Sequence, residues 1–247
     1  MGDQSRIEWT EATWNPTVGC TRVSPGCKFC YASVMHARLT EMGMRKYAQP
    51  FRAVRPWADH LELPLRWKAP RVIFVNSMSD LFHEALPIDY IRGVFDVMAA
   101  ADWHTFQVLT KRSERLLELA PQLPWPRNVW MGVSVESADY VDRVRDLARV
   151  PAAVRFLSVE PLLGPIPNLP LDGIAWVIVG GESGPSARPM ELSWARQIRD
   201  QCRKRGLPFF LKQLGGRAGK RGGSEARLDG RLWRDLPSIA SPTRAVV

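Results

Sequence analysis

Hydrophobic positions along the chain fall into six short continuous runs, each followed by a polar or helical segment. The runs are rich in β-branched and aromatic residues, as is typical of strands that are buried on both faces of a parallel sheet. A seventh candidate strand, 13–18, contains Pro16, and proline is confined to edge strands and bulges. The six runs cover residues 72–75, 106–109, 129–133, 154–157, 175–179 and 209–211.

Helical spacing of apolar residues fills the intervals between these runs, at 88–101, 114–120, 138–150 and 193–205. Alternating strands and helices indicate βαβ units and a parallel sheet. We therefore expect an α/β fold, a partial (β/α) barrel of the TIM-barrel type with six to seven parallel strands. A doubly wound open sheet is the alternative, although the first turn lacks the Gly-x-Gly-x-x-Gly of its dinucleotide-binding version.

Composition divides the chain into two parts and suggests its partners. We expect the barrel over residues 1–214 and a basic, glycine-rich extension over 215–247, either a solvated loop or a phosphate contact. The formal net charge of +9 suits an anionic partner such as nucleic acid, or reflects a generally basic surface. The sequence shows neither a signal peptide nor about 20 consecutive apolar residues, so we expect a cytoplasmic protein without a membrane span.

Three of the four cysteines, Cys20, Cys27 and Cys30, are arranged as C-x6-C-x2-C. In a reducing compartment, clustered cysteines bind metal more often than they form disulfides. Three thiolates leave one iron of a [4Fe–4S] cluster open, and an open iron can chelate S-adenosylmethionine. The alternatives are structural zinc with His36 or Cys202 as the fourth ligand, and a disulfide or inert thiols. Cys202 lies inside a predicted helix, where a cysteine usually acts as a small buried hydrophobe.

The segment Cys27-Lys28-Phe29-Cys30 resembles the second half of the radical S-adenosylmethionine superfamily motif, which has an aromatic residue before its last cysteine. The superfamily spacing is C-x3-C-x2-C, whereas this chain has six residues in the first gap. The resemblance implies a [4Fe–4S] cluster, S-adenosylmethionine as cofactor, and an electron donor such as flavodoxin or ferredoxin. It also implies that Phe29 packs near the adenine.

A wider resemblance covers nearly the whole chain. The sequence is similar to a bacterial and phage-encoded family of unknown function, which indicates a family but not a reaction. The motifs that carry this resemblance include Ile7-Glu8-Trp9-Thr10, Trp14-Asn15-Pro16, Asn76-Ser77-Met78-Ser79-Asp80-Leu81-Phe82, Leu109-Thr110-Lys111-Arg112, Gly132-Val133-Ser134-Val135-Glu136, Ser158-Val159-Glu160-Pro161-Leu162, Gly180-Gly181-Glu182-Ser183-Gly184 and Leu228-Asp229-Gly230-Arg231-Leu232-Trp233.

Polar or glycine residues follow each predicted strand, at the edge where parallel barrels place their active sites. The superfamily resemblance implies contacts of Asn76 and Ser77 with the cofactor's amino group, and of Ser134 and Glu136 with its ribose. Gly180 and Gly181 permit close backbone approach to the cofactor or substrate. The candidate catalytic residues are Lys111, Glu160, Glu182 and Lys212.

These patterns favour a radical S-adenosylmethionine enzyme, with nucleic acid or nucleotide modification or repair as the suggested chemistry. The positive charge, the basic extension and the resemblance to phage-encoded proteins motivate that substrate class. One alternative is a zinc-binding, non-catalytic nucleic-acid-binding protein. Another is a nonradical α/β enzyme in which the cysteines are incidental.

Overall fold

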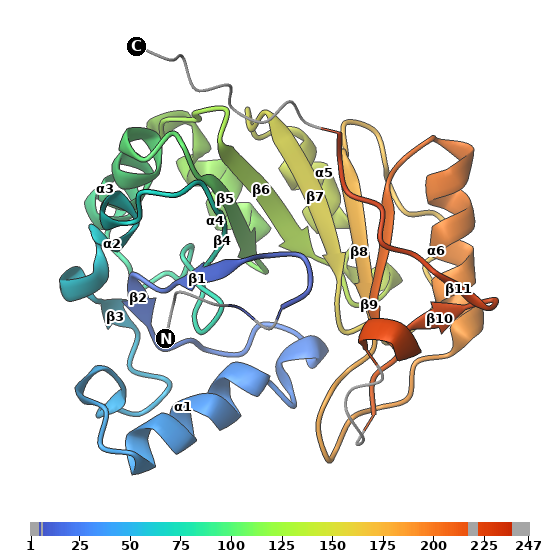
Figure 1. Cartoon of the computed structure of the whole chain (residues 1–247), viewed down its shortest axis with the longest axis horizontal. Coiled ribbons are helices and arrows are strands. Elements are labelled where there is room, and N and C mark those ends of the chain that lie inside the picture. Colours follow the sequence, from blue (N-terminus) through green and yellow to red (C-terminus); the bar gives the residue numbers. More distant parts are fainter. Residues whose placement is uncertain (1–4, 6, 217–221, 239–247) are drawn as a thin grey trace.

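The computed structural model describes residues 5, 7–216 and 222–238, and its centre is a curled sheet of seven parallel strands (Figure 1). The strands lie in chain order and the two edge strands do not pair with each other, so the sheet is an open half-barrel. This confirms the expected partial (β/α) barrel. In spatial order the strands are β1 (Ala12–Trp14), β4 (Val72–Val75), β5 (Thr105–Thr110), β6 (Val129–Ser134), β7 (Val154–Val159), β8 (Trp176–Gly180) and β9 (Phe209–Gln213).

Helices follow most strands and cover the outer face of the sheet (Figure 1). Among the described residues, no helix has both the length and the apolar character needed to cross a membrane. The α-helices are α1 (Tyr31–Glu41), α2 (Leu63–Arg66), α3 (Ile88–Ala100), α4 (Ser113–Leu119), α5 (Asp142–Ala148) and α6 (Leu192–Lys204). The 3-10 helices are η1 (Pro25–Cys27), η2 (Arg45–Tyr47), η3 (Ala58–His60), η4 (Ala120–Gln122), η5 (Ala138–Tyr140) and η7 (Gly223–Glu225).

The candidate strand 13–18 is wrong as one element, because the chain breaks at Pro16. Its first half is β1, and its second half, β2 (Thr17–Val18), pairs antiparallel with β3 (Arg55–Pro56) outside the main sheet. Proline has no N–H to donate, and the Pro16 carbonyl instead accepts the Trp57 N–H at 2.7 Å. The β2–β3 pair therefore brings the segment around Arg55 next to the chain that leads into the cysteines.

The C-terminal segment packs on the barrel as far as the structure describes it. Its hairpin consists of β10 (Arg227–Leu228) and β11 (Arg231–Leu232), and both Leu228 and Trp233 are buried in the main core. The Leu211 N–H donates to the Trp233 carbonyl at 3.0 Å. Residues 217–221 and 239–247 lie outside the described part, so the phosphate contact suggested for the basic extension stays a prediction.

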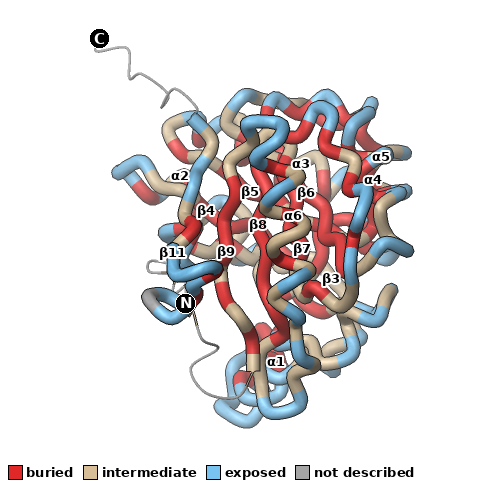
Figure 2. The backbone as a smooth tube through the Cα atoms, turned by 90° about the vertical axis from the view of Figure 1, so that its right-hand side faces the viewer, coloured by how far each residue is buried: buried red, intermediate tan, exposed pale blue. Residues whose placement is uncertain are grey.

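The near-continuous apolar runs have a simple cause, since both faces of the sheet are buried (Figure 2). Side chains alternate between faces along a strand, so one half of each run must contact each layer. On β8, Val177 belongs to the core under the helices, whereas Trp176 and Ile178 belong to a second cluster. The second cluster consists of Trp9, Phe74, Phe156, Trp176, Ile178 and Phe210.

Two glycines give a matched test of this packing. A Cβ on Gly132 would lie 2.5 Å from the Phe156 ring, whereas a Cβ on Gly93, within α3, would meet nothing within 4 Å. We expect Gly132→Ala to lower the free energy of unfolding by about 1–3 kcal/mol through overpacking. Gly93→Ala should raise it by about 1 kcal/mol, because alanine favours a helix interior. Urea denaturation of both variants checks this, and shifts of the same sign would contradict the packing described.

Candidate functional site

The three clustered cysteines line one cavity of about 500 Å³ beyond the carboxyl ends of the strands. Cys20 follows β2, Cys27 ends η1, and Cys30 immediately precedes α1, which lies below the strand ends in Figure 1. The structure thus brings together the three residues that the spacing singled out. The remaining lining residues are Thr21, Arg22, Ser33, Pro50, Phe51 and Arg52.

The cysteine cavity does not contain a closed set of metal ligands. Within the described ranges, no three His, Cys, Asp or Glu side chains are arranged so that they could hold a metal ion. His36, one suggested fourth zinc ligand, has its Nε2 2.8 Å from the Gln49 carbonyl oxygen, and its ring packs on Tyr47 and Phe51. Cys202, the other, is fully buried within α6 in the main core.

Arg112 fixes the first part of the cysteine loop, defined here as residues 19–30. It lies at the start of α4 and is buried. Its Nη2 donates to the Thr21 hydroxyl at 2.9 Å and to the Thr21 carbonyl at 3.2 Å, and its Nη1 lies 3.9 Å from Cys20 Sγ. Asp80 and Glu84 balance its charge, at 3.4 Å and 3.0 Å. A buried guanidinium therefore holds the segment that contains Cys20.

The Cys20 thiol favours its neutral form. Burial, reinforced by the Asp80 carboxylate, raises the pKa of Cys20 to about 12, although Arg112 opposes the shift. A coordinating metal ion has the opposite effect on a thiol, because its positive charge favours the thiolate.

Glu136 fixes the middle of the cysteine loop. It follows β6, is fully buried, and accepts the Ser24 hydroxyl at 2.5 Å and Arg143 Nη1 at 2.9 Å. Lys111 Nζ adds a weaker ion pair at 3.7 Å. A Cβ on Gly26 would lie 2.4 Å from Glu136 Oε1, so the loop rests directly on this carboxylate. Glu136 and Lys111, both predicted site residues, therefore meet beneath the loop.

Glu182 and Arg188 fix the end of the loop. Arg188 pairs with the Glu182 carboxylate through Nε at 2.8 Å and through Nη2 at 2.6 Å. The same Nη2 donates to the Pro25 carbonyl at 2.9 Å, and the guanidinium lies 5.5 Å from the centre of the Phe29 ring. Gly181, which precedes Glu182, permits the close approach of the Leu214 backbone, because a Cβ there would lie 2.4 Å from the Leu214 carbonyl oxygen.

Glu160 and Lys212 form a second pair at the strand ends. Lys212 Nζ lies 2.6 Å from Glu160 Oε2, and the two side chains retain 25% and 12% exposure, respectively. A Cβ on Gly180 would lie 3.0 Å from the same Glu160 oxygen, so this glycine makes room for the carboxylate. The pair is part-buried yet accessible, which is the environment in which a carboxylate and an amine can exchange protons with a ligand.

Asn76, at the end of β4, is the most unusual polar residue of the site. Its φ of 58° lies in the left-handed region, and its side chain is buried. Within the described ranges, neither its amide nitrogen nor its amide oxygen has a hydrogen-bond partner. The neighbouring Ser77 hydroxyl is bonded to the Asn15 amide, and the Ser77 carbonyl accepts the Tyr31 hydroxyl. An unpaired buried amide is costly, so Asn76 offers a donor and an acceptor to a ligand.

Several residues that hold this site were assigned no role by the sequence analysis. Asp80 and Arg112 belong to motifs that carry the family resemblance, so a signal was present for them. Arg143 and Arg188 gave none, because arginines in a basic chain are normally surface residues. Ser134, a predicted site residue, contacts Arg143 through its backbone, since the Ser134 carbonyl accepts a hydrogen bond from Arg143 Nη1 at 2.8 Å.

The structure is similar to solved structures of spore photoproduct lyase. One mutant of that enzyme matches with a TM-score of 0.48 and 13% identity, over 94% of this chain and 65% of that chain. A mutant with bound AdoMet and dinucleoside spore photoproduct gives 0.46 and 13%, over 83% and 64%. The chain thus spans less than two thirds of the length of these structures. Similarities this low assign it no activity.

No curated protein matches the sequence. The model of one protein family, in contrast, matches almost the whole chain, over residues 4–237. The chain therefore belongs to the family described as "Protein of unknown function (DUF5131)".

Proposed function

We propose that this chain is a radical S-adenosylmethionine enzyme in which Cys20, Cys27 and Cys30 hold a [4Fe–4S] cluster. The observation that carries the proposal is that these three side chains line one cavity at the carboxyl ends of a parallel half-barrel. That edge is where α/β barrels place their chemistry. Three separate clamps, made by Arg112, Glu136 and Arg188, fix the loop that presents the cysteines.

The chemistry of the three donors fits such a cluster, although their arrangement among the described residues is not that of a closed metal site. Thiolates are the ligands of iron–sulfur clusters, and three of them leave one iron for a further ligand. When bound, the cluster supplies one-electron reductive cleavage of a carbon–sulfur bond of S-adenosylmethionine, with flavodoxin or ferredoxin as the proposed donor class.

The chain's own residues bind and orient the cofactor. The unpaired Asn76 amide is the strongest candidate, because its oxygen can accept from the amino group and its nitrogen can donate to the carboxylate. Ser77 lies next to it, and Phe29 stands beside the last cysteine as a surface for the adenine. Ser134 and Glu136 remain the proposed ribose contacts, with Glu136 shared between the ligand and the loop.

The substrate-facing groups are Glu160, Lys212, Lys111 and Glu182. Glu160 and Lys212 form an ion pair, 2.6 Å between Oε2 and Nζ, that can bind a polar group of the substrate. Lys111 can offer a positive charge beside Glu136. The net charge of +9 supports a nucleic acid or nucleotide as substrate, with modification or repair as the reaction class.

Metal content and cofactor cleavage test the proposal. Anaerobically reconstituted protein should contain about four irons per chain and absorb broadly near roughly 400 nm. With a chemical reductant it should convert S-adenosylmethionine to 5′-deoxyadenosine. Cys27→Ala should lose the absorption and the cleavage, because only two ligands remain. Cys202→Ala is the matched control and should retain the absorption and the cleavage, since Cys202 belongs to α6 and is buried in the main core. Colourless protein that binds one zinc would contradict the proposal.

A substitution of Asn76 should weaken cofactor binding without lowering the stability of the fold. Asn76→Gly keeps the left-handed backbone at no steric cost and removes two unpaired polar atoms. We expect the affinity for S-adenosylmethionine to fall by about tenfold, since a charged-group hydrogen bond contributes about 1.5–3 kcal/mol. The free energy of unfolding should stay equal or rise by about 1 kcal/mol, because backbone strain is relieved.

Isothermal titration of iron-loaded protein and urea denaturation measure the two quantities for Asn76→Gly. Cys202→Ala again serves as the control that alters neither ligand binding nor cluster content. If Asn76→Gly leaves the cofactor affinity unchanged and lowers the free energy of unfolding, the Asn76 amide stabilises the fold and does not bind the cofactor.

A further inference from the structure

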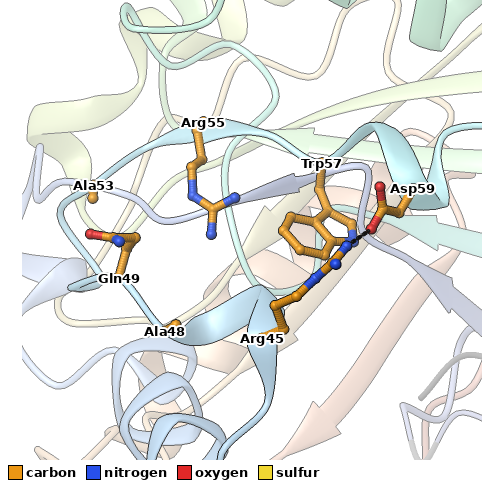
Figure 3. A pocket seen from close by; sticks show the side chains of 7 residues that line it. All are labelled: Arg45, Ala48, Gln49, Ala53, Arg55, Trp57 and Asp59. Carbon is orange, nitrogen blue, oxygen red and sulfur yellow. Dashed lines mark hydrogen bonds and ion pairs between the residues drawn. The ribbon is translucent and has the colours of Figure 1, made fainter.

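A second cavity, of about 570 Å³, lies between η2 and β3 (Figure 3). Arg45 extends from η2 toward Trp57 and Asp59, while Arg55 extends from β3 into the space facing Gln49 (Figure 3). Two alanines, Ala48 and Ala53, complete the lining and leave room for a ligand. We call this cavity the Arg45–Trp57 pocket.

The Arg45–Trp57 pocket carries an excess of positive charge. Arg55 and Arg45 lie 5.0 and 5.5 Å from the centre of the Trp57 ring, and Lys46 Nζ lies at 5.9 Å. Asp59 is the only carboxylate among the lining residues, and it is paired with Arg45. Burial, together with the charge of Arg55, lowers the pKa of Lys46 to about 8. This concentration of cations favours an anionic ligand.

The Arg55 guanidinium is only partly hydrogen-bonded within the part of the chain that the structure describes. Arg55 Nε and Trp57 Nε1 have no partner there, but both atoms are buried and do not open into the pocket. Arg55 Nη2 donates to the Lys46 carbonyl at 3.1 Å, which leaves the other terminal nitrogen for the cavity. A phosphate group presents only acceptor oxygens and a negative charge, and guanidinium groups match it geometrically.

The pocket adjoins the cysteine cavity across a single loop. Ala48, Gln49 and Ala53 face the Arg45–Trp57 pocket, whereas Pro50, Phe51 and Arg52 line the cysteine cavity. The Cys20 N–H donates to the Phe51 carbonyl at 2.8 Å, so this loop is bonded to the first cysteine. The two cavities therefore lie on either side of the same loop.

We infer that the Arg45–Trp57 pocket binds a phosphate group of a nucleic acid or nucleotide, whose reacting part then extends into the cysteine cavity. The inference rests on the proposed function for the reaction, and it adds the site where the substrate is recognised. Arg45 and Arg55 contact the phosphate oxygens. Asp59 competes with the phosphate for Arg45 and so weakens binding.

Fluorescence anisotropy of a labelled single-stranded oligonucleotide with the full chain, with and without iron, tests this site. We expect the double variant Arg45→Gln, Arg55→Gln to bind about tenfold more weakly and with a salt slope smaller by about one to two. Asp59→Asn should bind about twofold to threefold more tightly. The matched control is Arg145→Gln, which removes another exposed, acid-paired arginine, on α5, and should change affinity less than twofold.

Folding and ligand source are separated by two further measurements. Arg45→Gln alone removes a side chain that is 81% exposed, so its weaker binding cannot reflect misfolding. Displacement of the oligonucleotide by inorganic phosphate and a nucleoside monophosphate at similar concentrations assigns the pocket to a free nucleotide. Displacement by unlabelled oligonucleotide only assigns it to a nucleic-acid backbone.

The pocket and the proposed reaction can fail independently. Equal affinities of wild type, the Arg45→Gln variants and Arg145→Gln, or equal losses in all of them, would overturn the phosphate site while cofactor cleavage stands. Conversely, protein that never acquires iron but shows the expected differences among these variants would retain the phosphate site and lose the radical reaction.

Discussion

The constraint on which the site depends is the pairing of buried carboxylates beneath the cysteine loop. Glu136 is fully buried, and its two oxygens are divided between Ser24 of the loop and Arg143 of α5. A hydrogen bond to a charged group contributes about 1.5–3 kcal/mol. Conformations of the loop that give up the Ser24–Glu136 hydrogen bond are disfavoured for this reason, while the Glu136–Arg143 ion pair stays in place. A segment with little regular structure is thereby held on the barrel by a buried carboxylate.

Asn76 keeps a strained backbone because the residues next to it are fixed. A non-glycine residue with φ of 58° and an unpaired buried amide raises the energy of the folded chain. Such a residue persists only where its surroundings leave no alternative. The β1–β4 pairing and the Asn76 N–H, which donates to the Trp14 carbonyl at 2.8 Å, fix its backbone. The Asn76 amide is thus held in place before any ligand binds. A ligand that forms hydrogen bonds with it offsets the cost of leaving the amide buried and unpaired.

The sheet was predictable because burial on both faces makes most strand positions apolar, a local signal that a single sequence shows. The cysteine cavity was predictable for a related reason, since spacing and strand ends are both local. The contacts of the clamps were not predictable. Arg112 contacts Thr21 across 91 residues, and Arg188 contacts Pro25 across 163. Arg112 belongs to a motif of the family resemblance, but nothing local indicates its partner, and nothing local distinguishes Arg188 from the many solvated arginines. The division at Pro16 likewise depends on β3, a strand too short to leave a pattern.

The charged residues that hold the cysteine loop are different from the charged residues that surround Trp57. Asp80, Glu136 and Glu182 each have an arginine partner, so the charges of the three clamps on the cysteine loop are internally balanced. These part-buried pairs resist screening by salt, whereas exposed charges do not. One loop away, two arginines lie over Trp57, and Asp59 balances the charge of Arg45 but not that of Arg55. Under the proposed function, salt-sensitive contacts near Trp57 recognise an anionic substrate, while the balanced clamps keep the geometry of the cysteine cavity.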